Sequence, residues 1–274
     1  KKLEEALKLF EELLTENKRD PQIYIFIGII KAIKEERDEA ITLFNKAKDI
    51  DNKIPEIYFN LGKAYSLNGK LDLAILNYKK SIDINPKDSL SYKNLVIILL
   101  KTSKNEEALK LIESGIKVLP DNFDLNYYYG LALCRNAQYE QAYNHYKRII
   151  ISSPNDVGLK VNFGHLLTEL HLFNEAKSQF LGALRLDPND PALHMCYSEI
   201  LFRLKNYKEA WDEYEWRFVG EDSEVPLDFK GESPICKENN LENVKNILLV
   251  TEQGIGDSLQ FIRYAKHLKE RGKN

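Results

Sequence analysis

The 274-residue sequence predicts an all-α solenoid, in which helical hairpins stack one on the next over residues 1–224. Alanines recur every 34 residues, at Ala6, Ala40, Ala74, Ala108, Ala142, Ala176 and Ala210. Twelve residues before each alanine, from Ala40 onward, the side chain is almost always small, at Gly28, Gly62, Gly130, Gly164 and Ser198, with Val96 as the exception. Twelve residues after four of them stands a proline, at Pro86, Pro120, Pro154 and Pro188.

The unit 55–88 shows how this pattern specifies a hairpin. Its first helix presents large residues three or four apart on one face, and Asn68-Gly69 ends that helix because glycine adopts the left-handed conformation at little cost. Its second helix carries apolar residues from Leu71 to Ile82, and Pro86 ends it. Gly62 and Ala74 are small because the two helices cross closely there.

The same phase divides the array into a half repeat at 3–20 and full repeats at 21–54, 55–88, 89–122, 123–156, 157–190 and 191–224. Some positions depart from the pattern: Val96 replaces glycine, Lys31 occupies an apolar position, and the first large residue is replaced at Asn126, Lys160 and His194. We expect these substitutions to loosen individual units without breaking the phase.

This 34-residue unit closely resembles the tetratricopeptide repeat (TPR) family. The family pattern is carried here by Tyr58, Leu61, Gly62, Tyr65, Ala74, Tyr78 and Pro86. The resemblance implies a right-handed superhelix whose first helices line a concave inner surface that holds a peptide or protein ligand.

Candidate ligand-binding residues follow from counting the inner positions of each first helix. The fifth, sixth and ninth positions give a groove of aromatic, amide and basic side chains: Phe59, Asn60, Lys63, Lys93, Asn94, Tyr127, Tyr128, Asn162 and His165. An asparagine offers both a donor and an acceptor to a peptide backbone, so this lining suits an extended peptide.

Three interpretations of the groove residues remain open. Asn60, Asn94 and Asn162 resemble the asparagine ladder that holds the acceptor main chain in O-linked N-acetylglucosamine transferases, although Tyr128 interrupts it. Asparagine is alternatively a common residue at this position of such repeats. A two-carboxylate clamp would need several basic residues, of which Lys63 and Lys93 could supply part.

Composition excludes several other classes of protein. The formal net charge of −3 argues against nucleic-acid binding, and the longest apolar runs are too short to span a bilayer. Cys134, Cys196 and Cys236 are too few and too scattered for a disulfide framework or a cysteine zinc site, which favours the reducing cytoplasm. The five histidines show no metal-ligand spacing, so we expect no metal site.

The two tryptophans and the start of the sequence give two further expectations. Trp211 and Trp216 are expected to pack in the core of the last second helix and at the interface with whatever follows. Because the chain starts at Lys1 inside a helical pattern, we expect it to be part of a longer polypeptide.

The pattern changes after residue 218. Residues 225–244 have the composition of a linker, and the apolar run 246–251 predicts a buried strand. A turn with Gly254, Gly256, Asp257 and Ser258 then leads into an amphipathic helix that ends near Gly272. Residues 245–274 therefore predict the first βα unit of a Rossmann-like domain, with an anion site at the turn and without the third glycine of the dinucleotide fingerprint.

The junction 226–264 resembles bacterial proteins in which a TPR array runs into a heptosyltransferase-like glycosyltransferase domain. The resemblance implies that Asp257 is the position of the general base, that Gly254, Gly256 and Ser258 shape the turn, and that the parent protein uses a nucleotide-sugar donor. The chain lacks the second half of such a domain, so we expect it to hold no cofactor and to lack catalysis of its own. Residues 245–274 are expected to dock on the last repeat.

These observations together predict a peptide- or protein-binding scaffold that presents an acceptor to a glycosyltransferase. The alternative from another class is a non-enzymatic assembly scaffold that binds a copy of itself, as a homo-oligomer.

Overall fold

The computed structural model describes residues 2–219, 265–270 and 272, and these separate into two compact units, Lys1–Leu186 and Asp187–Asn274. The first unit holds eleven described helices: α1 (Lys2–Glu16), α2 (Pro21–Ile33), α3 (Arg37–Ile50), α4 (Pro55–Leu67), α5 (Leu71–Ile84), α6 (Ser89–Lys101), α7 (Asn105–Val118), α8 (Phe123–Arg135), α9 (Tyr139–Ser152), α10 (Val157–Glu169) and α11 (Phe173–Leu184). The second unit holds α12 (Pro191–Arg203), α13 (Tyr207–Tyr214), the 3-10 helix η1 (Glu215–Phe218) and α15 (Ala265–Glu270).

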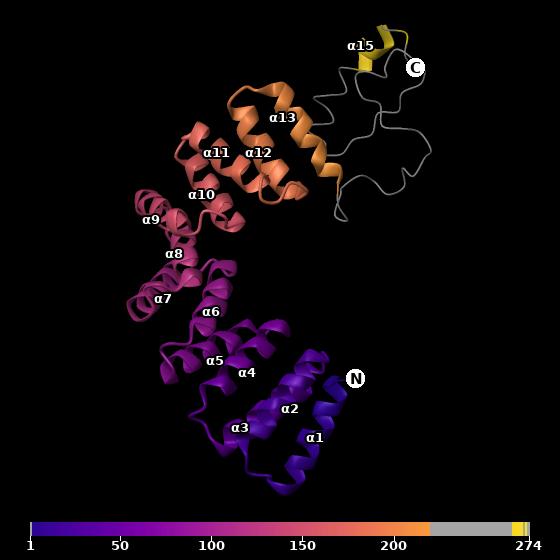
Figure 1. The fold of residues 1–274 in the computed structure, drawn as a ribbon, viewed down its shortest axis with the longest axis vertical. Coiled ribbons are helices and arrows are strands. Elements are labelled where there is room, and N and C mark those ends of the chain that lie inside the picture. Colours follow the sequence, from indigo (N-terminus) through magenta and orange to yellow (C-terminus); the bar gives the residue numbers. More distant parts are fainter. Residues whose placement is uncertain (1, 220–264, 271, 273–274) are drawn as a thin grey trace. The chain divides into compact units, whose positions relative to one another are not determined.

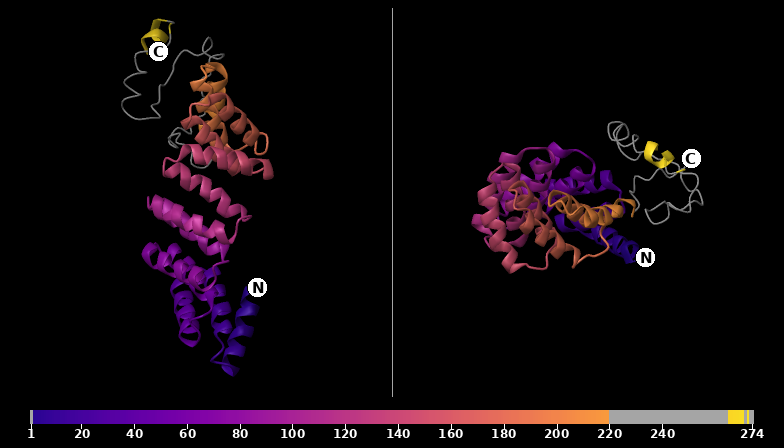
Figure 2. Two further views of the ribbon diagram at one scale, coloured as in Figure 1. Left: turned by 90° about the vertical axis from the view of Figure 1, so that its left-hand side faces the viewer. Right: turned by 90° about the horizontal axis from the view of Figure 1, so that it is seen from above.

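Within the first unit, each even-numbered helix pairs with the odd-numbered helix that follows it, and each pair packs on the next (Figure 1). The left view of Figure 2 shows the helices of the first unit following one another in chain order. The described residues contain no strand. The predicted all-α solenoid of helical hairpins is therefore confirmed.

The small residues of the repeat let the two helices of a hairpin approach closely. A Cβ atom added to Gly28 would lie 2.6 Å from the Phe44 ring, and one added to Gly62 would lie 2.8 Å from the Tyr78 ring. Gly130 and Gly164 lie equally close to the rings of the following helices. Each glycine thus accepts one large side chain from the second helix, and a larger residue would push the helices apart.

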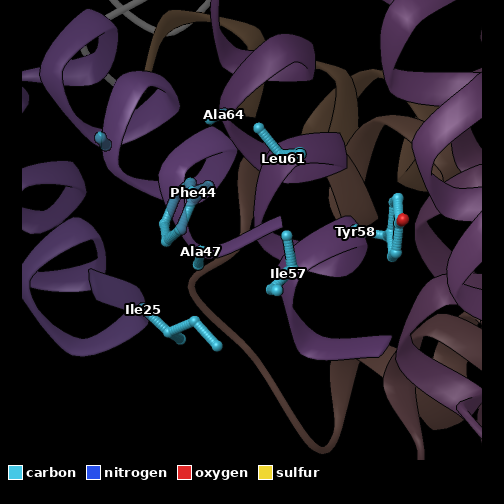
Figure 3. Close-up of a cluster of buried hydrophobic side chains, with 8 residues drawn as sticks. Ile25, Phe44, Ala47, Ile57, Tyr58, Leu61 and Ala64 are labelled. Carbon is cyan, nitrogen blue, oxygen red and sulfur yellow. The ribbon is translucent and has the colours of Figure 1, made fainter. Parts of the chain in front are cut away.

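Apolar clusters join one hairpin to the next. Ile25 of α2 and Phe44 of α3 pack with Ile57 and Leu61 of α4 in a cluster of buried side chains (Figure 3). A second cluster joins α5 to α6 through Tyr78 and Leu95. Because each cluster lies between neighbours in the sequence, the core is continuous along the array rather than central.

Asn126 and His194, which we expected to loosen their units, each keep a hydrogen bond that the usual tyrosine makes. At the equivalent position Tyr58 donates its hydroxyl hydrogen bond to the carbonyl of Asn52, 3.0 Å away and six residues earlier. The Asn126 amide donates to Pro120 O over 2.7 Å, and His194 Nε2 lies 3.0 Å from Pro188 O. Amide and imidazole therefore keep the bond that tyrosine makes to the preceding inter-repeat turn.

Lys31 is also compensated at its apolar position. Its ammonium group pairs with Glu36 and, at 2.8 Å, with Glu39. Hydrogen bonds from these carboxylates hold the pKa of Lys31 well above its usual range, so the ammonium stays charged. Lys31 is therefore stabilised by ion pairs with Glu36 in the following turn and Glu39 on α3, and not by burial in an apolar core.

The two tryptophans do not both belong to the α-helical core. Trp211 on α13 is 52% exposed and lies edge-on to Phe202, with ring centroids 4.9 Å apart. Trp216 lies in η1, beyond the end of α13, and stacks on His194 with centroids 3.8 Å apart. Trp211 is therefore not buried in the core, whereas the expected interface with the following segment lies outside the described residues.

Most of the predicted C-terminal unit lies outside the described residues. This applies to the linker 225–244, the strand 246–251, and the turn residues Gly254, Gly256, Asp257 and Ser258. The short helix α15 falls inside the predicted amphipathic helix, and Gly272 has a φ of +73° at its predicted end.

Candidate protein-interaction surface

The predicted ligand-binding residues lie on four first helices of the first unit. Among these helices, α6 contacts α8 and α8 contacts α10, so the side chains of these three helices are neighbours, while α4 carries the remaining predicted residues. We use the name inner face for the predicted residues Phe59, Asn60, Lys63, Lys93, Asn94, Tyr127, Tyr128, Asn162 and His165. Lys63 and His165 are exposed and the others are half-buried, which leaves each of them able to touch both the protein and a ligand.

Lys93 is paired with an acidic residue that sequence reasoning missed. Its Nζ lies 3.1 Å from both carboxylate oxygens of Asp124 on α8. The fifth position of one repeat thus meets the second position of the next, and this spacing of 31 residues is a signal that could have been read from the sequence. The pair neutralises Lys93, so the carboxylate clamp retains only Lys63 as an exposed cation among its predicted residues.

Two aromatic residues of α8 belong to the inner face, and a third aromatic residue of the same helix lies beside them. The rings of Tyr127 and Tyr128 meet edge to face, with centroids 5.1 Å apart, and Phe123 lies 6.3 Å from Tyr127. Burial raises the pKa of Tyr127 and of Tyr128, so both hydroxyls stay protonated and can donate a hydrogen bond.

Tyr127 reaches across to the next first helix. A Cβ atom added to Gly158 on α10 would lie 3.2 Å from the Tyr127 hydroxyl oxygen, so glycine leaves room for this approach. The Asn162 side chain faces the same hydroxyl and partly offsets the rise in its pKa. Nevertheless, Asn162 Nδ2 is buried and has no hydrogen bond of normal geometry within the described residues.

The three asparagines of the proposed ladder are therefore not equivalent. Asn60 Nδ2 donates to Glu56 O of its own helix over 2.8 Å, which uses one of its two amide hydrogens. For Asn94 the described part of the chain supplies no hydrogen-bond partner, and Asn162 has a buried amide nitrogen without one. The half-buried side chain of Asn94 therefore keeps unused hydrogen-bonding capacity, whereas the amide nitrogen of Asn162 is enclosed beside the Tyr127 hydroxyl and Asn60 is partly satisfied.

Two further residues of the inner face, Phe59 and His165, also pack against other side chains of the protein. Phe59 lies 6.0 Å from Tyr78 and contacts the cluster between α5 and α6, so it contributes to the core. His165 lies edge-on to Phe180, with centroids 5.3 Å apart. A hollow of about 660 Å³ at the α6–α7 turn, lined by Lys104, Asn105 and Arg135 among others, contains none of the predicted residues.

His145 of α9 has structural rather than ligand-binding surroundings. His145 is buried with Nε2 2.8 Å from Asn126 O, and burial lowers its pKa, so the neutral ring donates this bond. Within the described residues no group of histidine, cysteine and carboxylate side chains could hold a metal ion. None of the described helices is long and apolar enough to cross a membrane.

Models of known protein families match most of the array of repeats. Residues 55–88, 77–110, 94–157 and 161–223 match models described as "Tetratricopeptide repeat", and residues 28–69 match one described as "TPR repeat". None of the curated proteins matches the sequence.

Several solved structures share the fold at low sequence identity. A tetratricopeptide repeat protein from Parabacteroides merdae is 14% identical with a TM-score of 0.62, covering 81% of this chain and 89% of that one. PilF of Pseudomonas aeruginosa is 14% identical with a TM-score of 0.61, covering 74% of this chain and 93% of that one.

A structure of the APC/C hetero-tetramer Cut9–Hcn1 is 17% identical with a TM-score of 0.61 over 78% of this chain. The match spans only 43% of the length of that chain. At such identities the similarity shows the fold alone. Together with the repeat matches over 28–157 and 161–223, it establishes that the chain belongs to the tetratricopeptide repeat family.

Proposed function

We propose that the inner face of the first unit binds an extended peptide segment of a partner protein, as part of a TPR scaffold for protein–protein interaction. The observation that supports it most directly is the half-buried side chain of Asn94, which has no hydrogen-bond partner among the described residues and lies on α6, next to the aromatic side chains of α8. An extended peptide has a free N–H and C=O at every residue, so it can satisfy the Asn94 amide while its side chains contact Tyr127 and Tyr128.

Substitution of two asparagines of the expected ladder tests this proposal. Asn94→Ala with Asn162→Ala should weaken peptide binding by about 1 kcal/mol per lost backbone hydrogen bond, or roughly fivefold for each. A fluorescent library of unmodified 12-residue peptides, read by anisotropy, first selects a binding sequence as the probe.

The structure offers a matched control. Asn77 on α5 donates to Leu73 O of its own helix over 2.7 Å, as Asn60 does to Glu56 O. Asn77→Ala should leave peptide affinity unchanged, and Asn60→Ala should weaken it less than Asn94→Ala does. Equal affinity of the wild type and the double variant would reject the asparagine ladder.

The acceptor-presenting role in a glycosyltransferase is a second proposal, supported only by the sequence resemblance of 226–264. In it, Asp257 serves as general base and a nucleotide sugar is the donor. Calorimetric titration of the whole protein with nucleotide sugars, followed by assay of sugar transfer, tests this role. Absence of both binding and transfer would remove it and leave the peptide-binding proposal untouched.

An assembly scaffold that binds its own copies is the alternative to both. It predicts concentration-dependent association in sedimentation, lost when the inner face is altered by Tyr128→Ala. For the compartment we propose the cytoplasm, which agrees with the thiol of Cys134, which forms no disulfide. Burial raises the pKa of Cys134 to about 11, so this thiol is protonated and unreactive.

A further inference from the structure

The imidazole ring of His194 on α12 is enclosed by three groups of the second unit. Its Nδ1 meets the Glu213 carboxylate of α13, and its Nε2 lies 3.0 Å from the carbonyl oxygen of Pro188 in the turn before α12. The indole of Trp216 in η1 covers the face of the ring, with centroids 3.8 Å apart and planes 2° from parallel. Only 11% of the His194 side chain is exposed. One ring therefore joins the turn, α13 and η1 to α12.

Both nitrogens of this ring face hydrogen-bond acceptors. A carboxylate and a peptide carbonyl accept hydrogen bonds and donate none, whereas a neutral imidazole donates from only one of its nitrogens. The bonds to Glu213 and to Pro188 therefore form together only when the His194 ring carries a proton on each nitrogen. The same charge strengthens the stack on Trp216, because the face of an indole attracts a cation.

Glu213 is the charged group in contact with the ring, and the other charged groups of the surrounding elements are engaged elsewhere. The Asp190 carboxylate accepts a hydrogen bond from the amide of Ala192 at the start of α12. The Glu209 carboxylate of α13 accepts one from the Tyr197 hydroxyl over 2.8 Å. The remaining charged side chains of the turn, α13 and η1 are exposed or paired with each other: Asp187, Lys208, Asp212, Glu215 and Arg217.

Other repeats make the equivalent bond to the preceding turn without a charge. Tyr58 donates it through a hydroxyl to Asn52 O, and Asn126 donates it through an amide to Pro120 O. Neither group changes its charge near neutral pH. Histidine is the side chain whose charge ordinarily changes between about pH 5 and 8, so a histidine here makes the contact sensitive to protons.

We propose that His194, Glu213 and Trp216 form a proton-operated clasp that holds η1 against α12 and α13. While the ring is charged, it donates to both acceptors and stacks on the indole as a cation. At higher pH the ring releases one proton to water. One nitrogen then turns a lone pair towards an acceptor, so that this hydrogen bond and the attraction between cation and indole are lost, and η1 is held less firmly. This inference does not depend on peptide binding at the inner face.

Trp216 itself reports the state of the clasp. The chain has two tryptophans, so Trp211→Phe in the whole chain leaves Trp216 as the reporter, and a stacked imidazolium quenches indole fluorescence. Between about pH 5.5 and 8.5 the emission of this variant should rise roughly twofold as the ring loses its charge. Quenching of the same emission by acrylamide should also increase roughly twofold, because η1 loosens and exposes the indole.

His194→Asn is the matched control, because Asn126 makes the equivalent bond without a charge. Added to Trp211→Phe, it should make both the emission and the acrylamide quenching independent of pH. Circular dichroism verifies that this variant folds. Should it fail to fold, His194→Tyr takes its place, because Tyr58 makes the same bond in the repeat 55–88.

Glu213→Gln tests the acceptor on α13. Glutamine keeps an oxygen beside the His194 ring but removes the negative charge that favours the charged ring. Added to Trp211→Phe, this substitution should move the midpoint of the fluorescence change about one pH unit lower.

Four results would overturn the proposal. Constant emission of the Trp211→Phe variant over this pH range shows that the ring does not change its charge there. A pH-dependent emission that persists in the His194 variant assigns the change to another group. An unchanged midpoint in Glu213→Gln removes the carboxylate from the clasp. A change in emission without a change in acrylamide quenching shows that η1 stays in place when the ring loses its proton.

Discussion

Two neighbouring hairpins, α4–α5 and α6–α7, solve the same packing problem with different residues. In α4–α5 the helices meet through Gly62 and Tyr78, whereas in α6–α7 the equivalent positions are Val96 and Ile112. Both residues of the second pair are fully buried. A branched side chain has replaced the glycine, and a smaller aliphatic side chain has replaced the ring. The hairpin therefore depends on the combined volume of the pair rather than on glycine itself.

The largest effect on stability is expected when one member of the Gly62–Tyr78 pair is enlarged alone. Gly62→Val should destabilise α4–α5 by about 3 kcal/mol, because its Cβ would lie 2.8 Å from the ring of the buried Tyr78. Urea unfolding measures the loss, and hydrogen exchange should locate it in α4 and α5. A loss under about 0.5 kcal/mol would mean that the helices simply separate at no cost.

Replacing both members of the Gly62–Tyr78 pair tests whether their combined volume determines the stability of the hairpin. Gly62→Val with Tyr78→Ile recreates the Val96–Ile112 pair in α4–α5 and should recover more than half of the stability lost by Gly62→Val. The two substitutions should therefore couple by at least about 1 kcal/mol in a double-mutant cycle. Additive effects would contradict the volume argument.

The reverse change in α6–α7 should cost less. Val96→Ala removes two buried methyl groups without adding strain, so we expect a loss of about 2 kcal/mol. The exposed Leu73 on α5 provides the control, since Leu73→Ala should change the free energy of unfolding by no more than about 0.5 kcal/mol.

The buried His145 distinguishes α8–α9 from both of these hairpins by its pH dependence. Its pKa is lowered in the folded state by burial, so its contribution is complete above the unfolded value of about 6.5 and is lost as the pH falls below it. The slope should not exceed about 1.4 kcal/mol per pH unit for this single proton. Comparing thermal unfolding of the wild type and His145→Gln from pH 7.5 to 5 should show a smaller acid loss in the variant.

The smallest effect concerns the turns of the two hairpins. Gly69 in α4–α5 has a φ of +70°, and Ser103 in α6–α7 has a φ of +58°, a conformation that glycine adopts more easily. Ser103→Gly should stabilise the protein by about 0.5 kcal/mol, and Gly69→Ala should destabilise it by a similar amount. If both substitutions destabilise the protein, side-chain contacts of Ser103 outweigh its backbone strain.

Much of the fold could be predicted from the sequence because each contact joins neighbours in the chain. The 34-residue phase placed Ala40, Phe44 and Leu61 in the core, where they are buried. The candidate surface was less predictable. The same pattern that assigned Lys93 and Asn60 to the inner face did not reveal that one is paired with Asp124 and the other is bonded to its own helix.

The sequence by itself determined the hairpins, their order and the face that each helix buries, because helical periodicity and side-chain volume are local properties. Only the tertiary structure decided which polar groups are satisfied, since a hydrogen bond depends on the positions of two atoms that lie up to a full repeat apart. It left the side chain of Asn94 without a hydrogen-bond partner among the described residues, and it gave Asn126 and His194 the hydrogen bond that a tyrosine makes in other repeats.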